Sequence, residues 1–474
     1  MNKSKFNLQN TKYKIPNTNH GITLVALIIT IIVLLILAMV SIRLVMNGGI
    51  IGKAESGTQA YKDSEIQEQI KLAYNEWQTA RWDGTAGDAK AFMKNRLKST
   101  FNLQDNQISV DEESGTYTVT MTIDNKEKTY TFNAATGTTA KVKTIAEYPT
   151  ATPGTATTEN SKFVADGKTA VIPAGYAISN VATEQSIDTG LVITKGGNEW
   201  VWIPVSSSDL AAMYTQDNTG WTMSGTGTNG IEAVITKYKT TGTQSRGNPG
   251  TTSFREPDVL NNDSYDKNTT NLSNAGLGAN IGEAATKLRD DYKAMIDSVK
   301  KNGGFYIGRY ELSSAGTKKN QASLTDTNWY NLYKACKDID STGVVTTMIF
   351  GCQWDQVCKF ITTAKDANGD TISLTDSRKY GNYQNSEAPA NGGNWVTRTK
   401  QNTGSNEAWK TNNIYDLAGN CYEWTQEACF TVRRAIRGGS YSHNGDGDPV
   451  ARRGYRNPTD TDGTLSSRPV LYIK

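Results

Sequence analysis

The 474-residue sequence predicts an α+β protein, in which a membrane-spanning helix and a small β-sheet precede a large, loop-rich domain. Three observations support this fold class. Residues 22–46 form the one long apolar run, and residues 117–123 alternate between apolar side chains and threonine before a turn and a return strand with Tyr130 and Phe132. The long remainder of the chain shows few helical patterns and many Gly, Thr and Asn residues, with 43 glycines in the whole sequence.

The apolar run is long enough to cross a bilayer as a helix. Residues 22–46 exceed the roughly 20 residues that a spanning helix needs, and they exceed the roughly 7–15 apolar residues of a secretory signal. Lysines precede the run and predict a cytoplasmic N-terminus. We therefore expect a protein of the bacterial cell membrane and cell surface, whose C-terminal domain is extracellular.

Residues 1–21 form a basic leader that ends in Gly21, directly before the apolar run. This arrangement resembles the N-terminus of type IV prepilins. The resemblance implies that a prepilin peptidase cleaves after Gly21 and that Ile22 becomes the methylated N-terminus, with other pilin subunits as partners. Ala26 stands at the fifth mature position, where most pilins carry Glu, and this departure argues against efficient polymerisation. A plain, uncleaved membrane anchor is the alternative.

A small pilin-like unit is expected over residues 47–145. Apolar residues recur there at the spacing of an amphipathic helix, and a β-hairpin pattern follows around a turn at residues 124–126. Residues 146–159 contain two prolines and no periodicity, so they predict an interdomain linker. The helical stripe consists of Ile66, Ile70, Ala73, Tyr74 and Trp77.

Residues 160–474 are expected to form the large domain. Strands are predicted near residues 170–177 and 199–205. One helix should begin after Asn280, with Glu283 three residues on, and end at Asn302. Two further helices are expected near residues 329–339 and 353–361.

Four segments of this domain carry a family signature. They are GGFYIGRYE (303–311), NIYDLAGNCYEW (413–424), RGGS (437–440) and RPVLYIK (468–474). Together they resemble the formylglycine-generating enzyme (sulfatase-modifying factor) family, whose catalytic domain is a variant C-type-lectin fold. The resemblance implies that fold for residues 160–474. The chain departs from the family where Ser467-Arg468-Pro469-Val470 replaces the closing G-F-R strand.

The resemblance does not extend to the family's oxidase chemistry. The family places two copper-binding cysteines after its R-G-G-S motif, whereas His443 and Asp448 stand at those positions here and no cysteine follows Cys429. Thiolates are the ligands that hold cuprous copper. The chain has only two histidines, so a monomer cannot build a three-His iron site. We expect no copper or iron site and no catalytic residue, although an enzyme with altered chemistry stays an alternative.

The same family signature implies a calcium site. The matching positions are Asp416, Gly419, Cys421 (through its backbone oxygen) and Glu423. Carboxylate and carbonyl oxygens are suitable Ca²⁺ ligands. A turn stabilised by the two carboxylates without a metal is the alternative.

The segment after the R-G-G-S motif is predicted to bind a ligand, because lectin-type folds tend to present ligand-binding residues there. Tyr, Asn, Ser, Gly and Arg are also typical of adaptable binding surfaces. The alternative is a polar loop in which Arg452 and Arg453 pair with acidic neighbours. The candidate ligand-binding residues are Tyr441, His443, Asn444, Asp446, Asp448, Arg453, Tyr455 and Arg456.

These features predict a surface protein that binds an extracellular glycan or protein ligand, for adhesion or ligand capture. The net charge of +3 is too small to indicate a nucleic-acid partner. A structural minor pilin or pseudopilin subunit is an alternative. Binding regions of this fold are hypervariable in some proteins diversified by retroelements, and the residue types after the R-G-G-S motif agree with such a protein.

Overall fold

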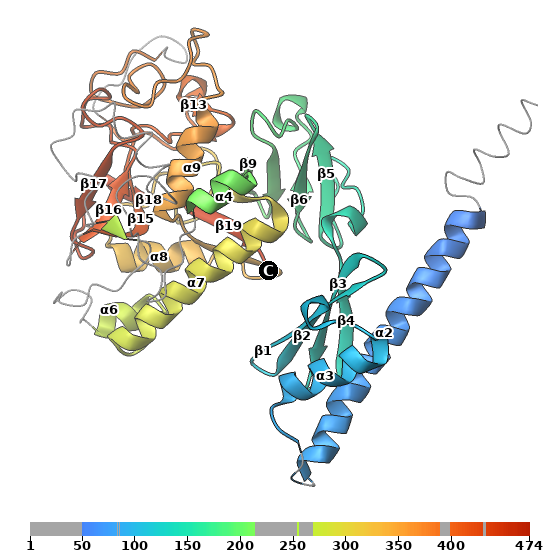
Figure 1. The fold of residues 1–474 in the computed structure, drawn as a ribbon. Helices are drawn as coiled ribbons and strands as arrows, with labels where there is room; N and C mark the ends of the chain where they lie inside the picture. Colours follow the sequence, from blue (N-terminus) through green and yellow to red (C-terminus); the bar gives the residue numbers. More distant parts are fainter. Residues whose placement is uncertain are drawn as a thin grey trace, which may run out of the picture. The chain divides into compact units, whose positions relative to one another are not determined.

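The computed structural model describes residues 50–82, 84, 86–213, 254–255, 269–388, 399–429 and 433–474. The chain divides into two compact units, residues 1–143 and residues 144–474. Several sheets and few helices confirm the α+β class (Figure 1). Gly21 and the apolar run at residues 22–46 lie outside the described residues. Among the described helices, none combines the length and the apolar character that a bilayer crossing requires.

The first unit places two helices on one face of an antiparallel four-stranded sheet (Figure 1). The predicted helical stripe is confirmed, since Ile66, Ile70, Ala73 and Tyr74 are buried against the sheet. Helix α3 was not predicted. The elements are α2 (Ile50–Trp82), α3 (Ala89–Phe101), β1 (Ile108–Glu113), β2 (Thr116–Ile123), β3 (Lys126–Asn133) and β4 (Thr138–Val142).

The predicted hairpin is confirmed as β2 and β3. Tyr117 faces Phe132 across the two strands, and Val119 faces Tyr130. All four side chains are buried, whereas the threonines between them lie on the other face, as period-two alternation requires.

Asp63 connects α2 to strands β3 and β4 of this sheet. Its Oδ1 accepts hydrogen bonds from Lys128 Nζ and Tyr130 Oη, each at 2.9 Å, and its Oδ2 accepts one from Lys141 Nζ at 2.9 Å. Burial alone would raise the pKa of Asp63, but these hydrogen bonds lower it well below its usual range.

The second unit contains an antiparallel six-stranded sheet, in which the C-terminal strand lies between two others. The strand expected over residues 170–177 is instead two short strands, β6 (Lys168–Ile172) and β7, which belong to different sheets. Pro173 separates them, since proline has no N–H to donate to a ladder. The six-stranded order is β12 (Val344–Met348), β19 (Pro469–Ile473), β11 (Gly304–Gly308), β9 (Asn198–Pro204), β8 (Val192–Lys195) and β7 (Ala177–Ile178); β6 pairs with β5 (Ser161–Ala165).

A five-stranded sheet carries the C-terminal signature segments. Its strand order is β10-β15-β16-β17, and β18 pairs in parallel with β15. The chain passes from β18 in this sheet to β19 in the six-stranded sheet through a single residue, Arg468. The strands are β10 (Phe254–Arg255), β15 (Tyr422–Cys429), β16 (Arg433–Arg437), β17 (Arg453–Arg456) and β18 (Leu465–Ser467).

The three predicted helices of the second unit are all present. α7 (Ile281–Asn302) begins at Asn280, whose Oδ1 accepts a hydrogen bond from Glu283 N at 3.0 Å, and it ends before Gly303, which has a φ of 75°. α8 (Trp329–Lys337) ends two residues earlier than expected, and α9 (Gly351–Ile361) begins two residues earlier. The sequence prediction did not include the short helices α4 (Ser207–Met213) and α6 (Thr269–Asn274).

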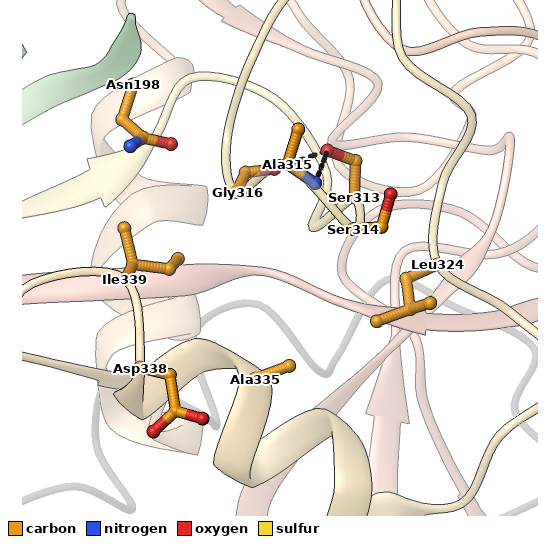
Figure 2. Close-up of a pocket in the computed structure, with 9 residues that line it drawn as sticks. All are labelled: Asn198, Ser313, Ser314, Ala315, Gly316, Leu324, Ala335, Asp338 and Ile339. Atoms are coloured by element: carbon orange, nitrogen blue, oxygen red, sulfur yellow. Dashed lines mark hydrogen bonds between the residues drawn. The ribbon is translucent and has the colours of Figure 1, made fainter. Parts of the chain in front are cut away.

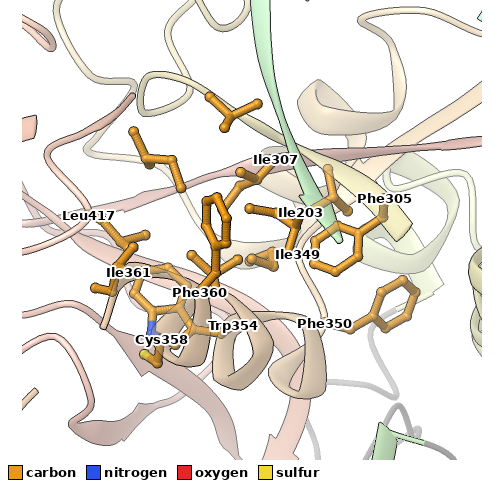
Figure 3. Close-up of a cluster of buried hydrophobic side chains, with 14 of the residues drawn as sticks. Ile203, Phe305, Ile307, Ile349, Phe350, Trp354, Cys358, Phe360, Ile361 and Leu417 are labelled. Carbon is orange, nitrogen blue, oxygen red and sulfur yellow. The ribbon is translucent and has the colours of Figure 1, made fainter. Parts of the chain in front are cut away.

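α9 forms the centre of the main core. Its Trp354, Cys358 and Ile361 are buried with side chains from the six-stranded sheet, such as Ile203 and Ile307 (Figure 3). Trp354 Nε1 also donates a hydrogen bond to the backbone carbonyl of Val450 at 3.1 Å. The core therefore holds the segment that follows the R-G-G-S motif in place.

Residues 146–159, the predicted linker, lie in the second unit. Tyr148 and Ala151 are buried there, and Thr157 Oγ1 donates a hydrogen bond to the carbonyl of Pro173 at 2.7 Å. Tyr148, Ala151 and Thr157 thus attach this stretch to the unit, whereas most of its other side chains are exposed.

Candidate functional site

Two consecutive glycines redirect the chain at the end of β16. Gly438 and Gly439 have φ angles of 87° and 77°, which L side chains rarely adopt. A Cβ atom on Gly439 would lie 2.2 Å from the carbonyl oxygen of Asp448. The R-G-G-S motif is therefore needed for the close approach of residues 440–452 to the sheet, and this segment then continues as β17.

His443 and Asp448 both contact Tyr422. The imidazole of His443 packs edge-to-face on the Tyr422 ring, with centroids 5.1 Å apart, and Tyr422 Oη donates a hydrogen bond to Asp448. His443 Nδ1 is 2.8 Å from Oγ of the fully buried Ser440 and 3.1 Å from Oγ of Ser442. These side chains stabilise one another within the surface.

A pocket of about 250 Å³ opens beside this cluster, between β16, β17 and the loop before β17. β17 is the last strand on its side of the described sheet, so the pocket lies at a sheet edge. Its lining is aromatic and strongly basic. The residues that line it are Tyr422, Arg433, Ile436, Asp448, Arg452, Gly454, Tyr455 and Arg456.

A buried ion network joins the strands that carry this pocket. Asp355 of α9 accepts hydrogen bonds from Arg437 Nη2 at 2.8 Å and from Arg453 Nη2 at 2.7 Å. Arg453 Nε also donates to Glu427 of β15 at 2.9 Å. Burial raises the pKa of Glu427, and the neighbouring guanidinium groups oppose that shift. The network joins α9, β15, β16 and β17, so the strands around the pocket are rigidly placed.

The structure brings together three of the eight predicted ligand-binding residues, namely Asp448, Tyr455 and Arg456. Arg453 does not line the pocket, because its side chain is only 3% exposed and belongs to the ion network. The alternative interpretation, in which Arg452 and Arg453 pair with acidic neighbours, holds for both residues, since Arg452 forms an ion pair with Asp448.

The remaining predicted residues do not line the pocket. Asn444 and Asp446 are exposed, and Asp446 accepts a hydrogen bond from Asn385 Nδ2 at 3.0 Å. Tyr441 is half-buried, and its backbone N–H donates to the carbonyl of Asn420 at 3.0 Å.

Sequence reasoning missed five lining residues. Arg433 and Ile436 precede the R-G-G-S motif in the strand that pairs with β17, so a predicted β16–β17 hairpin register would have indicated them. Tyr422 lies in the preceding strand, and no local pattern in the sequence places it beside residues 30 positions later. Gly454 also lines the pocket. A Cβ atom at this position would lie 3.1 Å from Ile436 Cγ1, which is a tight contact. Arg452 is the fifth.

The predicted calcium ligands fall in a second, deeper cluster. Asp416 Oδ2 accepts hydrogen bonds from Thr403 Oγ1 at 2.9 Å and from Gly404 N at 2.7 Å, and Oδ1 has no hydrogen-bond partner among the described residues. Glu423 and Glu311 are also fully buried, and the negative charges of Asp416 and Glu423 both act on Glu311. Burial, followed by the charges of Asp416 and Glu423, raises the pKa of Glu311 well above its usual range.

This cluster does not fit a calcium ion in the arrangement seen. Arg468 donates to both carboxylate oxygens of Glu423, from Nε at 2.9 and 3.0 Å and from Nη2 at 2.6 Å. A metal would have to displace a buried guanidinium from its carboxylate, at the cost of leaving that cation unpaired. Across the described residues, no three His, Cys, Asp or Glu side chains are grouped to hold a metal. Binding of calcium through Asp416, Gly419, Cys421 and Glu423 stays an untested prediction.

A second pocket, of about 460 Å³, lies between the turn at residues 313–316 and the end of α8 (Figure 2). Its polar groups are used locally, since Ser313 Oγ donates to the carbonyl of Gly316 at 2.7 Å and accepts from Ala315 N at 3.1 Å. Asp338 pairs with Lys334 of the same helix. No aromatic or cationic side chain lines this pocket, so the β16–β17 pocket is the stronger candidate.

Comparisons with known proteins identify no family for the chain. No protein family matches the sequence, and no curated protein matches it. Among solved structures, CarF shows 12% identity and a TM-score of 0.25 over 36% of this chain and 87% of CarF. PvdO from Pseudomonas aeruginosa shows 14% identity and a TM-score of 0.25 over 36% of this chain and 82% of PvdO. Variable protein 1 of Treponema denticola shows 14% identity and a TM-score of 0.22 over 66% of this chain and 99% of that protein. All three likenesses are therefore remote.

Proposed function

We propose that the second unit is a non-catalytic ligand-binding domain that the chain displays at a bacterial cell surface. The observation that carries this proposal is the β16–β17 pocket, in which Tyr422 and Tyr455 lie beside three arginines. Aromatic and arginine side chains are the residue types that most often carry binding energy in recognition sites. The buried pairs of Asp355 hold the pocket walls in place, so the binding surface is preformed.

The side chains beside the pocket support binding rather than catalysis. A nucleophile needs access to substrate and a base that activates it. Ser440, the hydroxyl closest to His443, is fully buried, and Asp448 is occupied by Tyr422 and Arg452. An enzyme with altered chemistry and a structural pilin subunit are the competing functions.

The membrane segment gives this domain its proposed location. The apolar run at residues 22–46 would anchor the chain as a single-pass helix, with a prepilin peptidase cutting after Gly21. Other pilin subunits are proposed partners of the anchored chain, and an extracellular glycan or protein is the proposed ligand.

A ligand screen tests the proposed function. Full-length protein in a neutral detergent would be applied to a glycan array and to extracellular protein extracts, in parallel with Tyr455→Ala. We expect ligands that bind the wild type and are lost with the variant. Turnover of a bound compound would support the enzyme, and an absence of any ligand together with incorporation into a filament would support the structural subunit.

A diversified binding site makes a separate prediction about natural variation. If a retroelement diversifies this chain, sequences of the same locus in related strains should differ mainly within residues 441–457. Substitutions spread evenly over the second unit would oppose that origin without changing the ligand-binding proposal.

A further inference from the structure

The β16–β17 pocket carries an excess of positive charge. Three arginines line it, Arg433, Arg452 and Arg456, against the single carboxylate of Asp448. That carboxylate is already neutralised, because it forms an ion pair with Arg452 and accepts a hydrogen bond from Tyr422 Oη. Two guanidinium groups therefore remain without an acidic partner in the pocket.

The contacts of these two groups leave their charges available. The Arg433 guanidinium lies 4.7 Å from the centre of the Tyr455 ring, a cation–π contact that orients the group without neutralising it. Arg456 Nη1 makes one long hydrogen bond, of 3.4 Å, to the carbonyl of Tyr455. Within the part of the chain that the structure describes, neither arginine forms an ion pair.

An unused donor lies at the same place. Nε of Arg452 is buried and has no hydrogen-bond partner among the described residues. A buried donor without a partner costs on the order of 1–3 kcal/mol, and most such groups in native proteins are satisfied by a ligand, water or protein atom. The pocket thus combines two cations without acidic partners with a donor that lacks an acceptor.

We infer that this pocket binds the carboxylate of an acidic sugar unit, an assignment that rests on the proposed ligand-binding function. The planar guanidinium groups of Arg433 and Arg456 match the geometry of a carboxylate, which can accept two parallel hydrogen bonds from one arginine. The sugar hydroxyls would meet the remaining donors of the pocket, and a C–H face of the ring would meet Tyr455, which is half-buried.

The dimensions of the pocket favour a uronic or similar sugar acid over an acidic peptide. Its volume of about 250 Å³ is slightly smaller than a typical small-molecule pocket of roughly 300–1,000 Å³, so it suits one sugar residue. A Glu side chain would lose rotamer freedom worth up to about 2 kcal/mol on binding, whereas a pyranose ring holds its carboxylate rigidly.

The test uses full-length protein in neutral detergent and a matched pair of probes. A galacturonate oligosaccharide carries the carboxylates, and its fully methyl-esterified form keeps the same backbone without charge. We expect the esterified probe to bind at least about tenfold more weakly, a loss that both Arg433→Gln and Arg456→Gln reproduce for the acid probe. Lys301→Gln removes the same charge from an exposed site on α7 and should leave the affinity unchanged.

Other outcomes separate this inference from the proposed function. Equal binding of both probes, with loss in Tyr455→Ala, would overturn the carboxylate assignment but keep the ligand-binding pocket. Acid-selective binding that survives both arginine substitutions would place the anion site elsewhere. Binding of an oligoglutamate peptide without the sugar acid, or of a sulfated oligosaccharide alone, would overturn the assigned ligand in favour of that probe. Absence of binding to every probe would overturn the inference, and the broader ligand screen would then decide the proposed function by itself.

Discussion

Arg468 forms a bidentate ion pair with Glu423, and both side chains are fully buried at the point where the chain crosses between its two large sheets. The same guanidinium donates to the carbonyl of Gly308 at 3.0 Å and to that of Tyr415 at 2.8 Å. One side chain therefore connects β15, β11 and the short strand β14 (Ile414–Tyr415). This role explains why Arg468 fits at a position between β18 and β19 where no solvent reaches it.

Removing this cation should strongly destabilise the second unit. Arg468→Met leaves the Glu423 carboxylate buried without its partner, and loss of one member of a buried pair typically costs about 3–5 kcal/mol. Urea denaturation of the full-length protein would measure this cost. The double variant Arg468→Met/Glu423→Leu should recover much of the loss, because no charge is then left unpaired. A loss below about 1 kcal/mol in the single variant would contradict this account.

The buried carboxyls also predict a pH dependence of stability. Burial raises the pKa of Asp416 to about 6 and the pKa of Glu423 to about 7, although Arg468 opposes both shifts. Both groups bind protons more tightly in the folded state than in the unfolded chain, so the free energy of unfolding should fall as the pH rises from about 4 to about 7. Asp416→Asn should reduce that fall by on the order of 2 kcal/mol, as measured by urea denaturation at about pH 5 and about pH 8.

Asp188→Asn provides the control for this pH effect, since Asp188 is exposed and pairs with Lys168 at the surface. Its pH profile should match that of the wild type. Two results together would show that this cluster does not control the pH response. The free energy of unfolding of the wild type would rise over the same pH range, and Asp416→Asn would leave that pH profile unchanged.

Calcium should have little effect on the stability of the protein. Arg468 already occupies the carboxylate that the sequence signature assigns to the ion, so a chelator should leave the melting temperature unchanged. Differential scanning calorimetry with and without excess EDTA would check this expectation. A marked drop in melting temperature on chelation that Asp416→Ala abolishes would support a calcium site at Asp416, Gly419, Cys421 and Glu423 instead.

The prepilin-like leader makes a prediction about the mature N-terminus. In a bacterium with a prepilin peptidase, mass spectrometry should find a chain that begins at a methylated Ile22. A bulky substitution at Gly21 should block the cut, whereas Gly21→Ala should only slow it. A chain that still begins at Met1 would favour the plain membrane anchor.

Much of the fold could be predicted from local patterns. The stripe from Ile66 to Tyr74, the Tyr117–Phe132 hairpin and the Asn280 cap all follow from periodicity and capping chemistry that neighbouring residues determine. Helix α3 was not predicted although Ala89, Met93 and Leu97 recur every four residues, and tertiary packing of these side chains stabilises it.

The candidate site was less predictable, because the burial of a strand residue depends on which elements, distant in the sequence, cover it. Arg453 and Tyr455 are two residues apart in β17, yet the first is buried against Asp355 and the second lines the pocket. The composition of the segment gave no means to separate them. The partner of Glu423 was not predictable either, since Arg468 lies 45 positions later in the sequence and no pattern joins the two.

The affinity of one ligand for the wild type and for Tyr455→Ala tests the central claim most directly. Truncating an aromatic anchor typically costs about 2 kcal/mol or more, so binding should weaken on the order of thirtyfold. Tyr61→Ala is the matched control, because Tyr61 is 74% exposed on α2 of the first unit. Titration calorimetry should show a weakened Tyr455→Ala and an unchanged Tyr61→Ala. Equal affinities of the wild type and Tyr455→Ala, for a ligand that the second unit binds, would show that the β16–β17 pocket is not the binding site.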